Sequence, residues 1–221
     1  MKRKSLVTSA GFLAAFVLWT ILVCVVDVRP VGPNESSLGL AGINQFIHGL
    51  TGVNFKLYNL TDWLGLVPVA VCIGFGALGF SQWVTRKRIR KVDFSILLLG
   101  GFYIVNVAVY LLFEEWIINY RPVLINGVLE ASYPSSTTML TLCVMTTAQM
   151  QLKTRIPNKT ISRMVGIAIK AFTGFMVIGR FLSGVHWFSD IVAGCLLSAG
   201  LVMLYRFGTE WEESHDEICK E

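Results

Sequence analysis

The sequence predicts an all-α polytopic membrane protein with six transmembrane helices and both termini on the cytoplasmic side. Three observations support this fold class. Of the 221 residues, 54% are hydrophobic and only 15% are charged, which is less charge than soluble domains of this size carry. The charged residues are segregated, so that long neutral runs separate polar loops. Lysine and arginine also concentrate in loops that would share one side of a membrane.

Three neutral runs are long enough to cross a bilayer, because a transmembrane helix needs about 20 apolar residues. These runs are Leu6–Val26, Trp63–Thr85 and Phe94–Phe113. Three further spans are predicted over about 134–152, 162–179 and 188–206. The first run follows a basic start and resembles a signal peptide. It is too long and has no evident cleavage site before Asp27, so it is predicted to be an uncleaved helix.

The distribution of cations predicts the orientation. One side of the predicted bundle holds Lys2, Arg3, Lys4, Arg86, Lys87, Arg88, Arg90, Lys91, Lys153, Arg155, Lys159 and Arg163. The other side holds Arg29, Lys56, Arg121 and Arg180. Because basic loops remain cytoplasmic, the termini and both basic loops are predicted to be cytoplasmic. This asymmetry accounts for the net charge of +5, so the charge does not indicate a nucleic-acid partner. Contact of the basic loops with anionic membrane lipids is expected instead.

The chain is predicted to form a single membrane domain over 1–221, since it contains no repeat or linker. Residues 27–62 are predicted to be an extracytoplasmic loop that includes a helix lying in the membrane interface. Residues 207–221 are predicted to be an acidic cytoplasmic tail. The five cysteines lack metal-site spacing.

Two polar loops, about 117–136 and 179–190, are predicted to meet at the outer face. His186 and Asp190 are four residues apart, so on a helix they would share a face and touch. The carboxylate would then hold one ring nitrogen and leave the other free as base or nucleophile. Alternatively, the aspartate caps the last span beside an unrelated histidine. A metal site would need a third ligand, which only the nearby glutamates offer, and it is less favoured.

Two arginines and a hydroxyl-rich stretch suggest an anion site at the same face. Arg121 and Arg180 lie on a side otherwise poor in cations, and a guanidinium suits a phosphate or carboxylate. The alternative is that both side chains reach out to lipid headgroups. Pro134 suits the first turn of a helix. The amides and hydroxyls that follow it would face an anion at the positive end of that helix.

Three short motifs resemble those of the type 2 phosphatidic acid phosphatase (PAP2) superfamily. The family motifs are K-x6-R-P, P-S-G-H and S-R-x5-H-x3-D. The corresponding segments here are Arg121–Pro122, Tyr133–Ser136 and Gly179–Asp190. The third is the most specific, because its R-x5-H-x3-D spacing is intact. The resemblance covers about residues 60–206 and implies a PAP2-like helical bundle.

The resemblance implies a role for each matching position. His186 would attack phosphorus and form a phosphohistidine, with Asp190 orienting it. Arg121 and Arg180 would neutralise the phosphoryl oxygens. The residues that would complete this cradle as substrate-binding groups are Ser135, Ser136 and Thr137. The resemblance implies no metal or organic cofactor.

The sequence departs from the family where proton donation is concerned. The histidine of the second motif, which protonates the leaving oxygen, falls on Thr137, and the lysine of the first motif falls on Glu114. Three consequences are considered. The leaving group is a phosphate that needs no proton, as in a polyprenyl pyrophosphate. A different acid serves, the candidates being Glu130, Glu114 and Glu115. Or hydrolysis has been lost.

The sequence therefore predicts a phosphatase or phosphotransferase in the cell membrane that acts on a lipid phosphate or pyrophosphate at the extracytoplasmic face. The main alternative is a non-catalytic component that binds or transports a lipid phosphate on the same scaffold. A carrier or channel of unrelated fold would use Lys170 as an intramembrane charge. That reading leaves the histidine, the aspartate and both arginines unexplained.

Overall fold

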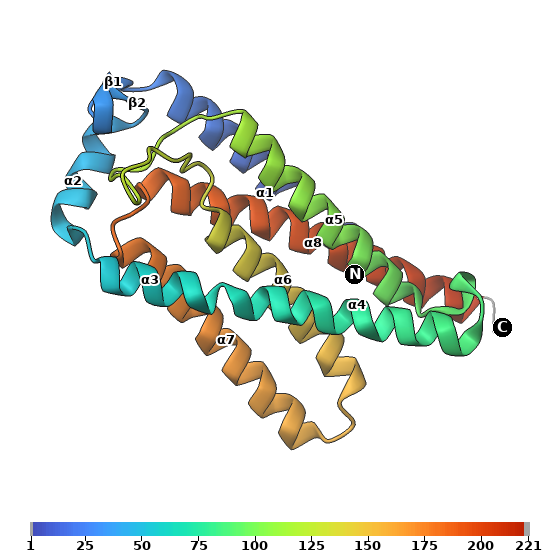
Figure 1. Ribbon diagram of the computed structural model, residues 1–221. Coiled ribbons are helices and arrows are strands. Elements are labelled where there is room, and N and C mark those ends of the chain that lie inside the picture. Colours follow the sequence, from blue (N-terminus) through green and yellow to red (C-terminus); the bar gives the residue numbers. More distant parts are fainter. Residues whose placement is uncertain (1, 219–221) are drawn as a thin grey trace.

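The computed structural model describes residues 2–218 and shows an elongated helical bundle (Figure 1). A short segment of small elements covers one end. The elements are α1 (Lys2–Val25), β1 (Arg29–Pro30), η1 (Pro33–Glu35), β2 (Ser37–Leu38), α2 (Ala41–Thr51), α3 (Phe55–Leu64), α4 (Leu66–Arg86), η2 (Ile89–Lys91), α5 (Phe94–Glu115), α6 (Ser136–Arg155), α7 (Lys159–Leu182) and α8 (Phe188–Ile218). The two strands, each of two residues, pair antiparallel as a short hairpin.

Five segments of the described chain are long and apolar enough to cross a membrane. They are Arg3–Val25, Phe55–Arg86, Phe94–Glu115, Lys159–Leu182 and Phe188–Glu212. The fourth predicted span, α6, lies in the middle of the bundle (Figure 1) but lacks this hydropathy. Its polar side chains bond within the protein: the Thr147 hydroxyl donates to the carbonyl of Cys143 (2.7 Å). A helix surrounded by other helices can carry such groups, because it does not face lipid. Six spans therefore remain a prediction.

Two predicted boundaries differ from the structure. The segment 27–62 is largely structured: α2 forms where the interfacial helix was predicted, and α3 leads into α4. The predicted tail begins inside α8, which continues to Ile218. An Arg206–Glu210 ion pair of 2.9 Å lies on this extension, and the Ser5 hydroxyl donates to Glu210 at 2.9 Å. The Ser5–Glu210 contact holds the extension against α1. Residues 219–221 of the predicted tail lie outside the described chain.

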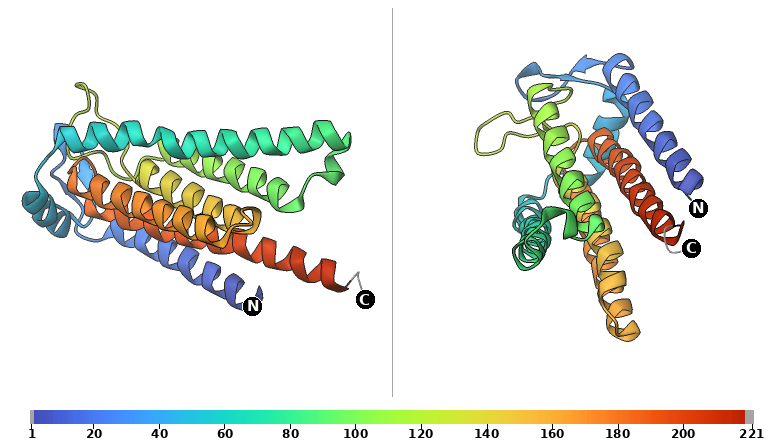
Figure 2. Two further views of the ribbon diagram at one scale, coloured as in Figure 1. Left: turned by 90° about the horizontal axis from the view of Figure 1, so that it is seen from below. Right: turned by 90° about the vertical axis from the view of Figure 1, so that its right-hand side faces the viewer.

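The two ends of the bundle differ in chemistry. The start of α1 and the end of α8 lie at one end, while α2, the hairpin and the loop between α5 and α6 lie at the other (Figure 2). At the first end Asp93 pairs with Arg86 (2.8 Å) and Arg155 (3.1 Å). The hydrogen bond from Arg86 is the main reason that the pKa of Asp93 falls to about 2. This carboxylate thus joins the α4–α5 turn to the end of α6.

Candidate active site

His186 lies in the short loop between α7 and α8, and backbone contacts fix that loop. Gly184 has a φ of +66°, and an added Cβ would lie 1.7 Å from the carbonyl oxygen of Gly52, so only glycine fits there. The Gly184 carbonyl accepts a hydrogen bond from Nε2 of His48 (3.0 Å). The Asn54 amide donates to the carbonyl of Ser183 (2.9 Å). His48 therefore serves the site by holding this loop.

The hydrogen bonds of His186 determine its tautomer. The ring is 4% exposed, and its Nε2 lies 3.3 Å from Nη1 of Arg121. A guanidinium can only donate, so Nε2 must be the unprotonated acceptor and Nδ1 must carry the hydrogen. Nδ1 faces the hydroxyl and the carbonyl of Ser132 at 3.0 and 3.2 Å. The nitrogen with the free lone pair is thus the one beside an arginine.

Asp190 reaches His186 through Ser132, whereas the sequence predicted direct contact. The Ser132 hydroxyl donates to Oδ2 of Asp190 (2.5 Å). Because α8 begins at Phe188, His186 precedes the helix and the i, i+4 geometry does not apply. Oδ2 also accepts from the amide of Trp187 (2.9 Å), so the aspartate caps α8 as well. One carboxylate thus caps the start of α8 and also accepts the hydrogen bond from Ser132 beside His186.

Arg180 is the most enclosed cation of the site. Its side chain is 2% exposed. Nη2 donates to Asp62 Oδ1 (3.1 Å) and to the Thr137 hydroxyl (2.7 Å), and the guanidinium lies over the Tyr58 ring, 4.8 Å from its centroid. Among the described residues, Nε of Arg180 has no hydrogen-bond partner. One buried N–H is therefore left for a group that the protein does not supply.

Arg121 contributes a second guanidinium with a more open environment. Its Nε lies 3.0 Å from a Glu130 carboxylate oxygen, and its guanidinium is 6.0 Å from the Tyr58 ring centroid. Tyr58 therefore lies beside both arginines. The two cations raise the cost of a further positive charge on the neighbouring histidine. Burial first, and then Arg121 and Arg180, hold the pKa of His186 well below its usual value. The ring is neutral at neutral pH.

The hydroxyls around the start of α6 divide into three groups. Ser135 directly precedes α6, which begins at Ser136, so Pro134 lies outside the first turn in which it was predicted. The Ser135 hydroxyl bonds the Thr138 hydroxyl (3.0 Å) and caps no amide. The Tyr133 hydroxyl meets Thr20 of α1 (2.7 Å), away from the site. Ser136 lines the pocket with His186, and Thr137 accepts from Arg180. Ser136 and Thr137 are thus the hydroxyls of the predicted cradle that face the site.

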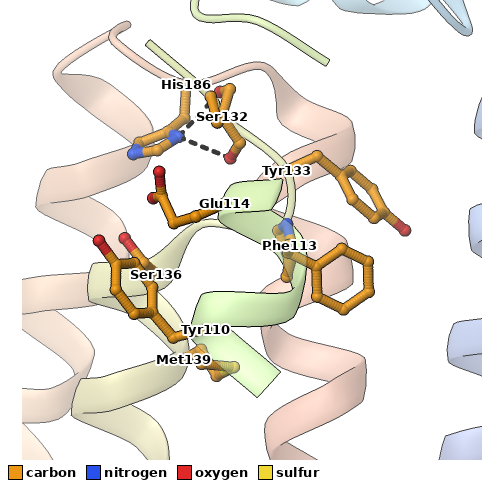
Figure 3. A pocket seen from close by; sticks show the side chains of 10 residues that line it. Tyr110, Phe113, Glu114, Ser132, Tyr133, Ser136, Met139 and His186 are labelled. Carbon is orange, nitrogen blue, oxygen red and sulfur yellow. Dashed lines mark hydrogen bonds between the residues drawn. The ribbon is translucent and has the colours of Figure 1, made fainter. Parts of the chain in front are cut away.

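The pocket beside His186 contains one of the three candidate acids. Glu114 of α5 lines it and points toward the His186 ring (Figure 3). Glu130 is instead paired with Arg121, and Glu115 does not line the pocket. The pocket encloses only about 10 Å³, close to the room that one water needs. A phosphate can enter only if side chains that line the pocket move, and the exposed ones are Tyr110 and Glu114.

Several residues of the site were not predicted from the sequence. Ser132 belongs to the hydroxyl-rich stretch, whose composition indicated an anion site, but nothing in the sequence distinguished Ser132 from the neighbouring hydroxyl residues. Asn119 donates to Oδ1 of Asp190 (3.0 Å), and Asp62 and Tyr58 hold Arg180 from α3. These three lie in segments without a recognisable motif. Among the described residues, no cluster of three or more His, Cys, Asp or Glu side chains could hold a metal ion.

Replacing Ser132 with alanine should lower kcat by about 10- to 100-fold for any reaction in which His186 is the reactive group, while KM changes little. The hydroxyl is the link between Asp190 and Nδ1 of His186, and loss of a supporting hydrogen bond typically has this size of effect. Steady-state kinetics measure it. Ser198→Ala is the matched control, because Ser198 is also buried but bonds the carbonyl of Met139. Equal activity of the two variants would remove Ser132 from the catalytic arrangement.

Comparison with known proteins identifies the family of this chain. The family model of the PAP2 superfamily matches residues 70–212, a range that contains Arg121, Arg180, His186 and Asp190. The chain belongs to the PAP2 superfamily. A transmembrane PAP2-type phosphatidylglycerolphosphate phosphatase from Bacillus subtilis has a similar structure, with a TM-score of 0.62 and 18% identity over 92% of this chain and 96% of that chain. A search of curated proteins finds no match.

Two residues that contact Arg180 lie outside the segment that the family model matches. It begins after α3, so Tyr58 and Asp62 lie outside it although they contact Arg180. PAP2 membership and the apolar helices support a multi-pass membrane protein. The solved structure shows that the two proteins share this fold.

Proposed function

We propose that this PAP2 protein dephosphorylates, or transfers phosphoryl from, a lipid phosphate or pyrophosphate through a phosphohistidine on His186. The observation that carries the proposal is the 3.3 Å contact between Nε2 of His186 and Arg121, next to the unpartnered Nε of Arg180. It places an unprotonated nitrogen lone pair among guanidinium donors, which is the environment that phosphoryl transfer to histidine requires.

The first chemical step follows from these contacts. Oxygens of the entering phosphate take over the Arg121 donor that Nε2 now accepts from, and they engage Nε of Arg180. Nε2 then forms a bond to phosphorus, and the bond from phosphorus to the leaving oxygen breaks with its electron pair on that oxygen. The ring becomes cationic. Its Nδ1–H donates to the Ser132 hydroxyl, which in turn donates to Asp190, and these two hydrogen bonds stabilise the cation. Water or an acceptor hydroxyl then breaks the N–P bond and regenerates neutral His186.

Protonation of the leaving oxygen is the step at which this chain departs from its family. Thr137 cannot donate a proton usefully, and its hydroxyl is engaged by Arg180. A pyrophosphate leaving group needs little protonation, which favours a lipid pyrophosphate such as a polyprenyl pyrophosphate. For a monoester, Glu114 is the acid placed in the pocket.

Glu114→Gln should separate these two substrate classes. We expect hydrolysis of a lipid phosphomonoester to fall by about 10²-fold or more, because the proton donor is removed. Hydrolysis of a lipid pyrophosphate should change by less than about tenfold, because its leaving group needs little acid assistance. Phosphate release from both substrates measures the ratio. Glu115→Gln is the matched control, since Glu115 follows in sequence but does not line the pocket. An equal loss on both substrates would exclude Glu114 as the acid.

One assay tests the proposed activity itself. Purified protein is offered lipid monophosphates and pyrophosphates, and released phosphate is followed in wild type and in Arg121→Ala. Activity in the wild type that Arg121→Ala abolishes supports the enzyme. Wild type that releases no phosphate from any of them, but binds them in a way that needs Arg121, would support the lipid-phosphate binding or transport component instead.

We place the site at the extracytoplasmic face of the cell membrane, with both termini cytoplasmic. The support is the excess of lysine and arginine in the loops at the opposite end. A cysteine substituted at Val128, an exposed position of the loop between α5 and α6, should react with an impermeant thiol reagent added to intact cells. Labelling that requires broken cells would reverse this orientation.

A further inference from the structure

A second cavity lies between α6 and α7, at the end of the bundle opposite His186. Its volume is about 780 Å³. The α7 wall is one helical face, in which Lys159, Arg163 and Lys170 recur at intervals of four and seven residues. The α6 wall is the face that carries Gln149 and Lys153. The two helices join at the turn near Pro157, which closes one end of the cavity.

The cations around this cavity are uncompensated. Lys153, Lys159, Arg163 and Lys170 all line it, and no aspartate or glutamate does. Within the described chain, none of the four makes a hydrogen bond or ion pair through its side chain. Arg155 on the same turn differs, because it is already paired with Asp93. Four like charges at one cavity repel each other, so an anion that binds there is stabilised by all of them.

The position of Lys170 indicates what kind of anion fits. It lies 11 residues after Lys159, or about 16 Å further along the helix at about 1.5 Å per residue. A lysine that far into an apolar span needs a partner or a route to the interface. Apolar residues such as Leu152, Ile156 and Ile167 share the cavity walls with it. The cavity therefore carries cations along its length, from the α6–α7 turn to Lys170, with apolar side chains between them.

We propose that this cavity binds the headgroup of an anionic phospholipid, in the leaflet opposite the one that His186 serves. The phosphate would lie beside Arg163 and Lys170, which are seven residues apart on one face of α7, and an acyl chain would lie along the apolar side chains of the same walls. Basic pockets between transmembrane helices bind acidic headgroups in this way. The α6–α7 turn stands apart from the α4–α5 turn and the termini (Figures 1 and 2). The cavity is thus open to lipid. This site is independent of the catalytic proposal.

Native mass spectrometry of the purified full-length chain, titrated with phosphatidylglycerol or phosphatidylcholine, tests the site. We expect one phosphatidylglycerol that phosphatidylcholine does not replace. In Arg163→Gln/Lys170→Gln its affinity should fall about 30-fold, at about fivefold for each cation removed. Both side chains are exposed, so folding should be retained, and the charge-preserving pair Arg163→Lys/Lys170→Arg should keep the affinity. A lipid held near His186 would remain in every variant, so the readout is the loss of one bound lipid.

Arg88→Gln/Lys91→Gln is the matched control. It also removes one arginine and one lysine at the same end of the bundle, but neither residue lines the cavity. An equal loss of phosphatidylglycerol in this control would show that general surface charge binds the lipid, and the proposal would fail. It would also fail if phosphatidylcholine bound equally well. Displacement of the lipid by inorganic phosphate would show a soluble-anion site and would likewise overturn it.

Discussion

His186→Ala should reduce phosphate release by about 10⁴-fold or more and should abolish a covalent phosphoenzyme. Loss of a nucleophile in a concerted catalytic group has effects of this order. No other described side chain offers a free nitrogen lone pair beside Arg121 and Arg180. Rapid acid-free quenching with a radiolabelled lipid phosphate, followed by digestion, should give an acid-labile label on the peptide that contains His186. The chain has three histidines, so the labelled peptide needs to be assigned among only three candidates.

The control for this experiment is His215→Ala, which removes a histidine of the acidic segment and should keep both the label and the activity. Thermal unfolding of His186→Ala shows whether the fold survives loss of the buried ring. A folded His186→Ala that still accumulates labelled histidine would assign the nucleophile to another residue.

The pH dependence of kcat/KM provides a second test of the same assignment. Burial and the two arginines hold the pKa of His186 well below 6.5, so the free enzyme keeps a neutral ring as the pH falls from 7 through 6.5. Activity should therefore persist through this interval and decline only at lower pH, where the ring becomes protonated. A kcat/KM that is half-maximal near pH 6.5 would mean that burial and the two arginines do not lower the pKa of His186.

The sequence predicted the bundle well where a helix faces lipid and less well where it faces protein. Runs such as Phe94–Phe113 are apolar because lipid surrounds them, and α5 coincides with this run. The helix α6 is surrounded by other helices, so its threonines and glutamines weaken the hydropathy signal although the helix is present. The amphipathic pattern of residues 38–50 likewise predicted α2. Span prediction therefore depends on the environment of each helix.

The candidate site shows a similar division. The R-x5-H-x3-D spacing was sufficient to bring Arg180, His186 and Asp190 together, because a loop of fixed length joins the end of α7 to α8. The direct His186–Asp190 contact was wrong for the same region, since helical spacing was applied to a residue outside the helix. Asp62 could not be predicted as a partner of Arg180, because its contact is made across 118 residues of sequence. Motifs identify local geometry, and only packing reveals such long-range partners.

Arg180→Lys should lower kcat/KM by about 10²- to 10³-fold, although the charge is retained. The guanidinium donates to Asp62 and Thr137 through Nη2 while its Nε remains available. A lysine ammonium is a single point and cannot keep both partners while it contacts a phosphoryl oxygen. Loss of one preorganised donor to a transition state costs about this much.

A purely structural role for Arg180 must be separated from this one, because the side chain also holds α3 at the Tyr58 ring. Inhibition by orthovanadate, which adopts the five-coordinate geometry of phosphoryl transfer, distinguishes the two. If Arg180 binds the transferred group, vanadate affinity should fall about as much as kcat/KM, because both report binding of the transition state. Arg155→Lys is the control, since Arg155 is also ion-paired but lies at the other end of the bundle. Unchanged vanadate affinity with a lowered melting temperature would make Arg180 a support for α3, and Arg121 would then be the principal phosphoryl-binding cation.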